Sequence, residues 1–203
     1  MPIDMPASPG FIACEFGLQT NTQKFESPLT KSVQRVLLGG ARWVATYTLP
    51  KMTRPQAAYW QAFLMQLEGG VNTFNAFDPD ARVPRGNITG STPLVKGAGQ
   101  TGSSLLIDGL APSTTGILLP GDYFSVGGQM VMVTAPLNSD GSGEGAVSFK
   151  AALRTSPADN APLTITNCTV PMVLVDDNQT RWSSGSRLGF YESITFAAME
   201  VFS

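Results

Sequence analysis

A single segment of this chain has the pattern of an amphipathic helix, and every other apolar run is short enough to be a strand. The segment opens with Thr53, Pro55 and Gln56, a capping box with proline in the first turn. It ends at Gly69 and Gly70, and glycine is typical of helix C-termini. Its apolar residues recur at helical spacing: Ala57, Trp60, Phe63, Leu64 and Leu67. We therefore expect one helix packed on a sheet in a mainly β protein, with a partner-binding face as the alternative for this stripe.

The segments around this helix have the composition of strands. We expect strands over residues 11–19 and 22–26 with a turn at Asn21, and a hairpin of residues 34–38 and 41–49 with its turn at Gly39-Gly40. In the last of these, Trp43, Ala45 and Tyr47 alternate with polar or smaller residues, which predicts that they face the core. Residues 71–77 form a further expected strand, which ends at the turn Asp78-Pro79-Asp80.

The composition changes near Thr92, after which Gly, Ser, Thr and Pro dominate and large aromatic residues become rare. Short strands are expected at residues 103–107, 122–126, 129–134, 146–149 and 163–166. Two closing strands, residues 169–175 and 191–202, regain the aromatic richness of the first half, and Ile194, Phe196 and Ala198 share one face of the second. We therefore predict a discontinuous main domain, residues 1–92 and 168–203, interrupted by a small inserted β-module, residues 93–167. The expected fold class is a β-sandwich or split barrel with one packed α-helix.

The chain contains no histidine among its 203 residues. This excludes Ser-His-Asp and Cys-His catalysis and every metal site that needs an imidazole. Charged residues make up only 14%, against 42% hydrophobic, with 21 Gly and 15 Pro. This balance is typical of a folded β protein, or of a surface covered by neighbouring subunits. We predict no catalytic, cofactor-binding or metal-binding residues and no enzyme activity.

Charge is unevenly distributed although the net charge is only −2. One stretch carries only Glu26 as an acid among six bases: Lys24, Lys31, Arg35, Arg42, Lys51 and Arg54. Another carries acids alone: Asp108, Asp122, Asp140 and Glu144. Both stretches are ordinary solvated faces, or a basic face of one subunit meets an acidic face of another.

Three motifs resemble sites but lack the context that their chemistry needs. Residues 97–102 match G-x-G-x-x-G, with Asp122 about twenty residues on, yet a strand and not a helix is expected next. Residues 138–144 are rich in oxygen ligands but lack the spacing of a calcium loop. The pairs Asp78 with Asp80 and Asp176 with Asp177 suit a glycosidase only if they converge in a cleft. We interpret all three as turns and loops.

Targeting signals are not expected in this sequence. The N-terminus lacks the charged and apolar regions of a signal peptide, and no apolar run is long enough to span a bilayer. Cys14 and Cys168 form no CxxC pair and are expected to be thiols in a reducing cytosol. The N-x-T triplets at Asn87, Asn167 and Asn178 are therefore taken as coincidence. The proline-rich first ten residues are either an arm onto a neighbouring subunit or a frayed terminus.

Residues 41–86 combine an aromatic strand, a helix with AFLxxLxGG (residues 62–70), a Phe-bearing strand and a DP…PRG turn (residues 78–86). In this pattern they resemble the distal tail protein family of long-tailed bacteriophages. LLPGDYFSVGGQMVMVT (residues 118–134) and the closing strand FYESITFAAMEV are also similar to such proteins.

The resemblance implies a structural virion protein made in the bacterial cytoplasm and located at the phage tail tip. It implies a homohexameric ring that joins the tail tube protein to tip and hub proteins of the baseplate, and that leaves a channel for transient passage of DNA. No catalytic residues, cofactors or membrane anchor are implied. We expect channel-facing residues to be neutral or acidic. Two alternatives stay open: a carbohydrate- or host-receptor-binding module and a carboxylate-dependent hydrolase. The first needs Trp43, Trp60, Trp182 or Tyr191 exposed on one face; Trp43 and Trp60 are expected to be buried by periodicity, so only Trp182 is a candidate.

Overall fold

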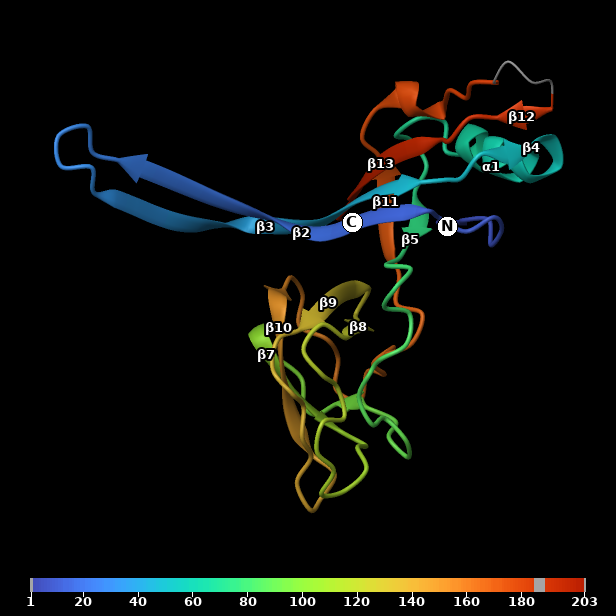
Figure 1. Cartoon of the computed structure of the whole chain (residues 1–203). Helices are drawn as coiled ribbons and strands as arrows, with labels where there is room; N and C mark the ends of the chain where they lie inside the picture. The colour runs from blue at the N-terminus through green and yellow to red at the C-terminus, as the bar shows by residue number, and fades with distance from the viewer. Residues whose placement is uncertain (1, 185–188, 203) are drawn as a thin grey trace. The chain divides into compact units, whose positions relative to one another are not determined.

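The computed structural model describes residues 2–184 and 189–202. The chain is mainly β and divides into two compact units (Figure 1). Unit 1 comprises Met1–Asn75 and Pro171–Ser203, and unit 2 is the intervening segment Ala76–Val170. A discontinuous unit with an insert was expected, but the insert begins at residue 76 where residue 93 was predicted.

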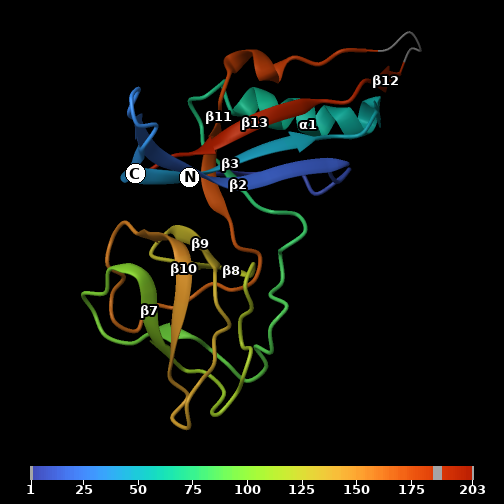
Figure 2. The ribbon, with the colours of Figure 1, turned by 60° about the vertical axis from the view of Figure 1, so that its left-hand side comes forward.

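Unit 1 contains a six-stranded sheet in the order β1-β5-β11-β13-β3-β2. Its strands are β1 (Ile3–Asp4), β2 (Ala13–Glu26), β3 (Val33–Thr48), β5 (Phe74–Ala76), β11 (Val170–Leu174) and β13 (Thr195–Glu200). A second small sheet pairs β4 (Met52–Thr53) with β12 (Phe190–Tyr191), and a 3-10 turn covers Asp177–Thr180. Figure 2 shows helix α1 (Arg54–Gln66) lying along the sheet.

Helix α1 forms as its sequence pattern predicts. Thr53 is the N-cap, and the amide oxygen of Gln56 accepts hydrogen bonds from the Thr53 backbone N–H at 3.1 Å and hydroxyl at 2.9 Å. The stripe of Ala57, Trp60, Phe63, Leu64 and Leu67 is fully or almost fully buried, so the core-packing interpretation is confirmed.

Aromatic rings fill the space between this helix and the sheet. Phe196 of β13 lies 6.2 Å from Trp60 and 5.4 Å from Tyr47, measured between ring centroids. Trp43, Ala45 and Tyr47 are buried, which confirms their predicted inward face. Ile194, Phe196 and Ala198 share one face as predicted, and that face is buried too.

Two predicted turns are wrong. The chain passes straight through Asn21 in β2 and through Gly39-Gly40 in β3, so four expected strands are two long ones that pair with each other. The two breaks lie opposite each other: Gln19 pairs with Arg42 and Asn21 with Leu38, so Thr20 alone faces Gly39, Gly40 and Ala41. The breaks therefore form one β-bulge, in which Gly40 takes a φ of +89°.

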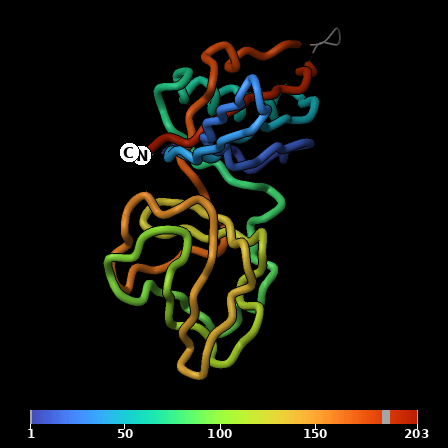
Figure 3. Tube along the Cα trace, turned by 90° about the vertical axis from the view of Figure 1, so that its left-hand side faces the viewer, coloured from blue at the N-terminus to red at the C-terminus, as the bar shows by residue number. Residues whose placement is uncertain are grey.

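Unit 2 contains a five-stranded sheet in the order β6-β7-β10-β9-β8. Its strands are β6 (Leu94–Val95), β7 (Gly102–Asp108), β8 (Tyr123–Val126), β9 (Gln129–Val133) and β10 (Gly145–Leu153). Figure 3 traces the winding path of the backbone through this unit. The unit has an apolar core of its own, which includes Phe124, Val131 and Phe149. Residues 163–166, predicted as a strand, contribute only an isolated bridge between Thr164 and Ser125.

Residues 76–92 belong to unit 2 because their polar groups are satisfied there. Asp122 is almost fully buried and accepts a hydrogen bond from the Arg85 backbone N–H at 3.1 Å, and Asn87 donates its backbone N–H to Gly116 at 2.9 Å. Gly86 lies so close to the carbonyl of Ile117 that a side chain would not fit. Sequence composition does not show such contacts, and this explains the later boundary that was predicted.

Candidate functional site

A two-stranded arm extends from the sheet of unit 1 (Figure 1). We define the arm as residues 20–41, the part of the β2–β3 hairpin beyond the Gln19–Arg42 pair. The pairing of β3 with β13 ends at Val44, where the buried carboxylate of Glu200 accepts a hydrogen bond from the Trp43 backbone N–H at 2.9 Å. Glu200 thereby replaces the next backbone partner of β3, and the hairpin continues alone.

Both faces of the arm are exposed. Residues paired across two strands share a face, and the faces alternate along each strand. One face is uncharged and carries Asn21, Gln23, Phe25, Gln34, Val36 and Leu38. The other, which we call the basic face, carries Thr22, Lys24, Glu26, Val33, Arg35 and Leu37. Large apolar side chains lie open on both faces and at the tip: Leu37 of the basic face is 72% exposed, and Leu29 at the tip is 93% exposed.

Lys24 and Arg35 are direct cross-strand partners on the basic face. Like charges placed opposite each other destabilise a strand pair. Glu26 does not neutralise them, because its carboxylate pairs with Lys31 at 3.1 Å. Across residues 2–184 and 189–202, neither Lys24 nor Arg35 forms an ion pair. The basic face therefore offers two unneutralised cations beside exposed aliphatic side chains.

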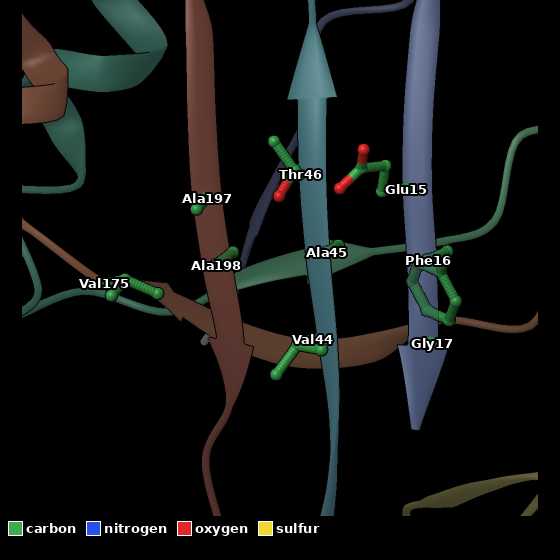
Figure 4. Close-up of a pocket in the computed structure, with 9 residues that line it drawn as sticks. All are labelled: Glu15, Phe16, Gly17, Val44, Ala45, Thr46, Val175, Ala197 and Ala198. Atoms are coloured by element: carbon green, nitrogen blue, oxygen red, sulfur yellow. The ribbon is translucent and has the colours of Figure 1, made fainter. Parts of the chain in front are cut away.

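A shallow hollow of about 320 Å³ lies on the sheet of unit 1, near the base of the arm (Figure 4). Glu15, Gly17, Val44, Thr46, Val175 and Ala197 are among the residues that line it. Glu15 is the one charged residue of the lining, and Figure 4 shows its side chain beside that of its cross-strand partner Thr46. Val175, Val44 and Ala197 make the rest of the surface mostly apolar.

Gly17 opens this hollow. It lies inside β2 opposite Val44, and a Cβ added to it would meet no atom within 4 Å. Glycine inside a strand weakens the strand and often marks a place where another backbone approaches closely. Gly17 therefore leaves space above the sheet that the structure of its own unit does not fill.

The glycine motif at residues 97–102 is a loop that leads into strand β7, as predicted. Gln100 holds the loop, since its side-chain amide donates to Gly97 at 3.1 Å and to Leu106 at 3.1 Å. Its oxygen accepts from the Leu106 N–H at 2.6 Å. No helix follows to bind a pyrophosphate, so the dinucleotide interpretation fails on geometry.

The carboxylate pairs occupy turns. Asp78 accepts hydrogen bonds from the Asp80 N–H at 3.1 Å and from the Tyr123 hydroxyl at 3.1 Å. Asp176 accepts from the Asn178 N–H at 2.9 Å, and the hydrogen bonds from Asn178 lower its pKa. Asp177 accepts from the Gly70 N–H at 3.0 Å, beside the end of α1. The carboxylates of Asp78, Asp176 and Asp177 are therefore engaged in local structure.

The oxygen-rich segment 138–144 is likewise a self-contained loop. Asp140 accepts from the backbone N–H groups of Glu144 at 3.0 Å and Ser142 at 2.8 Å, and these bonds lower its pKa. Glu144 forms an ion pair with Lys96, which raises the pKa of that lysine. Among the described residues, no three Cys, Asp or Glu side chains gather as metal ligands would.

The predicted acidic stretch does not form one free face. Asp122 is buried and forms an ion pair with the exposed Arg85, Glu144 pairs with Lys96, and Asp140 caps its own loop. Most of the predicted bases, by contrast, lie on or next to the arm. Arg42, at its base, donates to the side chains of Gln19 at 2.9 Å and Met199 at 3.1 Å.

The remaining predicted residues are dispersed. Trp43 and Trp60 are buried, whereas Trp182 is 42% exposed and Tyr191 is half-buried. Cys168 is buried, and burial raises the pKa of its thiol. Near the N-terminus, Ile3 and Asp4 of β1 pair with Phe74 and Asn75 in the sheet of unit 1. No helix in the described part of the chain is both long and apolar enough to cross a membrane.

Sequence reasoning missed the arm, the Lys24–Arg35 pair and the hollow at Gly17. Apolar residues on both faces of residues 33–38, with the base Arg35 between them, were the available signal. That signal has meaning only once the register of the hairpin is known.

No protein-family model matches the chain, and no curated protein matches it closely enough to indicate a relationship. The resemblance to phage distal tail proteins therefore depends on the sequence patterns described above.

Proposed function

We propose that this protein is a structural subunit that assembles with copies of itself through the arm, as a ring at the distal end of a phage tail. The observation that carries the proposal is the arm itself, a hairpin exposed on both faces and rich in apolar side chains. In the resembled family, such a ring joins the tail tube to the tip proteins and leaves a channel for DNA.

An isolated two-stranded hairpin is at best marginally stable in water. Contiguous exposed apolar surface marks an interaction site, and an uncovered strand edge invites pairing with another chain. In the sheet order of unit 1, β2 is an edge strand along its whole length. A neighbouring subunit would cover both the edge and the apolar side chains.

A contact between the arm of one copy and a different surface of the next is heterologous. Heterologous contacts close into rings when the rotation between copies permits it. The low charged fraction of 14% suits a subunit that shares much of its surface with neighbours. These features, with the family resemblance, support a homohexameric ring.

The experiment replaces residues 20–41 by an Asn-Gly turn, which suits a two-residue hairpin. The variant keeps Trp43 and every residue after it, so its core and α1 are expected to stay intact. Native mass spectrometry should then show oligomers of the full chain and monomers of the variant. A full chain that stays monomeric at high concentration, alone and with tail tubes, would refute the proposal.

The location in a phage tail has its own test. Purified tail tubes that lack their tip should bind the full chain at one end, and electron microscopy would show the added ring. If the chain binds along the whole tube, or forms oligomers that do not bind the tube, the location at the tail tip is wrong. The protein would then be an oligomer-forming subunit of another assembly.

Trp182 favours a second candidate function, in which the protein binds host-surface glycans. Its side chain is 42% exposed, and aromatic rings stack on sugar faces. Glycan-array binding that is lost in Trp182→Ala would support this function. If the unaltered chain binds no glycan, or if Trp182→Ala binds equally well, this second function is excluded.

A further inference from the structure

We propose that the hollow at Gly17 receives the basic face of the arm from a second copy of the chain. This inference rests on the proposed self-association and names the surface on the second copy. The two surfaces match in chemistry: Lys24 and Arg35 beside Leu37 on the arm, and Glu15 beside Val44 and Val175 in the hollow.

The pair cannot form within one chain. Glu15 and Lys24 lie on the same strand, β2, nine residues apart in sequence. At a rise of roughly 3.3 Å per residue, a strand separates them by about 30 Å. A carboxylate of this hollow can therefore reach the basic face only when the arm belongs to another copy.

The charges on each side also call for a partner. Across the described ranges, none of Glu15, Lys24 and Arg35 forms an ion pair. Repulsion between Lys24 and Arg35 destabilises the strand pairing of the free arm. A carboxylate placed against the two cations relieves that repulsion. Arg42 lies on the same sheet face as the hollow but is held by Gln19 and Met199.

Nucleic acid phosphate is the other ligand that two cations could take. The large aliphatic side chains of Leu37 and Val33 on the same face favour a protein partner, since they gain nothing from a phosphate backbone. Gly17 agrees with this choice, because a strand glycine with open space above it permits close approach of another backbone.

A charge exchange tests the contact. One variant carries Lys24→Glu with Arg35→Glu, and the other carries Glu15→Lys. In each variant alone, the arm and the hollow bear the same sign, so self-association should weaken by about tenfold or more. An equal mixture of the two should restore it, because each arm then meets a hollow of opposite charge. Native mass spectrometry would show mixed oligomers with equal numbers of both chains.

Steric filling tests the same surface without a change in charge. Gly17→Phe adds a ring at the hollow, where a Cβ meets no atom within 4 Å, and should also abolish association. Gly10→Phe is the matched control, since Gly10 lies in unit 1 and a Cβ there also meets no atom within 4 Å. Lys51→Glu and Glu192→Lys control for the charge changes, because that surface pair lies outside both arm and hollow. All controls should associate as the unaltered chain does.

The outcomes separate the two proposals. If the unaltered chain forms oligomers that the charge variants and Gly17→Phe leave intact, the inference about the hollow is wrong and the proposed function stands. The inference is equally wrong if folded charge variants fail to associate when mixed. The charge variant Lys24→Glu with Arg35→Glu can also be compared with the unaltered chain on a column of immobilised duplex DNA. If this variant associates normally but no longer binds the column, phosphate is the ligand of the basic face and the inference is overturned. An unaltered chain that stays monomeric with and without tail tubes removes both.

Discussion

Lys24 and Arg35 are like charges placed opposite each other in the arm, which destabilises the pairing of its two strands. They face each other across the arm without a counter-ion among the described residues. Replacing Arg35 by Thr removes the repulsion and keeps a residue that favours strands. We expect Arg35→Thr to stabilise pairing of the free arm by about 0.5 kcal/mol. Hydrogen exchange of the arm amides should slow roughly twofold, whereas Gln34→Thr on the uncharged face should leave it unchanged. Faster exchange in Arg35→Thr would show that the pair is not repulsive.

Glu200 fixes the point at which the arm leaves the sheet. Glu200 is 3% exposed and its carboxylate accepts a hydrogen bond from the Trp43 N–H at 2.9 Å, so loss of the carboxylate removes the partner of a buried donor. We expect Glu200→Ala to lower the free energy of unfolding by about 1–3 kcal/mol. Glu200→Gln keeps an acceptor oxygen and should cost less. Urea unfolding followed by tryptophan fluorescence measures both, and equal losses would mean that the hydrogen bond contributes little.

Cys168 gives unit 2 a dependence on pH. Burial raises the pKa of its thiol, so the folded chain holds this proton more tightly than the unfolded chain does. Its stabilising contribution is therefore complete below the unfolded pKa of about 8.5 and is lost as the pH rises through the higher folded value. Unfolding measured between pH 7 and pH 10 should show a smaller decline in Cys168→Ala than in the unaltered chain. Identical declines would contradict a buried neutral thiol.

At the scale of elements, residues Gly39-Gly40 form a bulge within strand β3, where a turn was predicted. Three residues of β3 face one residue of β2 there, and Gly40 has a φ of +89°. Deleting both glycines removes the excess and keeps the alternation of faces, because the deletion has an even length. We expect the deleted chain to fold with slower hydrogen exchange at the base of the arm. If the arm amides instead lose their protection from hydrogen exchange, the two glycines form a turn that the arm needs in order to fold.

The helix and the inward strand faces could be predicted because local sequence specifies them. The capping box at Thr53 and the alternation around Trp43 depend on residues a few positions apart. The arm could not be predicted in the same way. Asn21 and Gly39-Gly40 are ordinary turn signals, and only their position opposite each other, 18 residues apart, turns two breaks into one bulge. The face that Lys24 shares with Arg35 depends on this register.

The hollow was beyond prediction for a related reason. Glu15, Thr46 and Ala197 become neighbours only through the strand order β13-β3-β2, which joins the two ends of the sequence. The exclusion of histidine-dependent sites, in contrast, follows from the composition of the chain and needs no structure.

At the scale of the whole molecule, the insert enters and leaves through neighbouring strands. The division at Asn75 and Pro171 falls within β5 and β11, which are adjacent in the sheet of unit 1. Neighbouring strands lie roughly 4.8 Å apart, so a short connection can join them. The ring proposed above needs only unit 1, which carries both the arm and the hollow.

We therefore expect the two units to fold separately. Residues 76–170 expressed alone should unfold cooperatively, since the core of that unit is built from its own residues. A chain in which a Gly-Ser-Gly link joins Asn75 to Pro171 should retain α1 and form oligomers as the full chain does. Circular dichroism and native mass spectrometry measure these two properties. A shortened chain that folds but stays monomeric, when the full chain assembles, would show that unit 2 takes part in the contact between copies. In that case the arm and the hollow would not suffice for the ring.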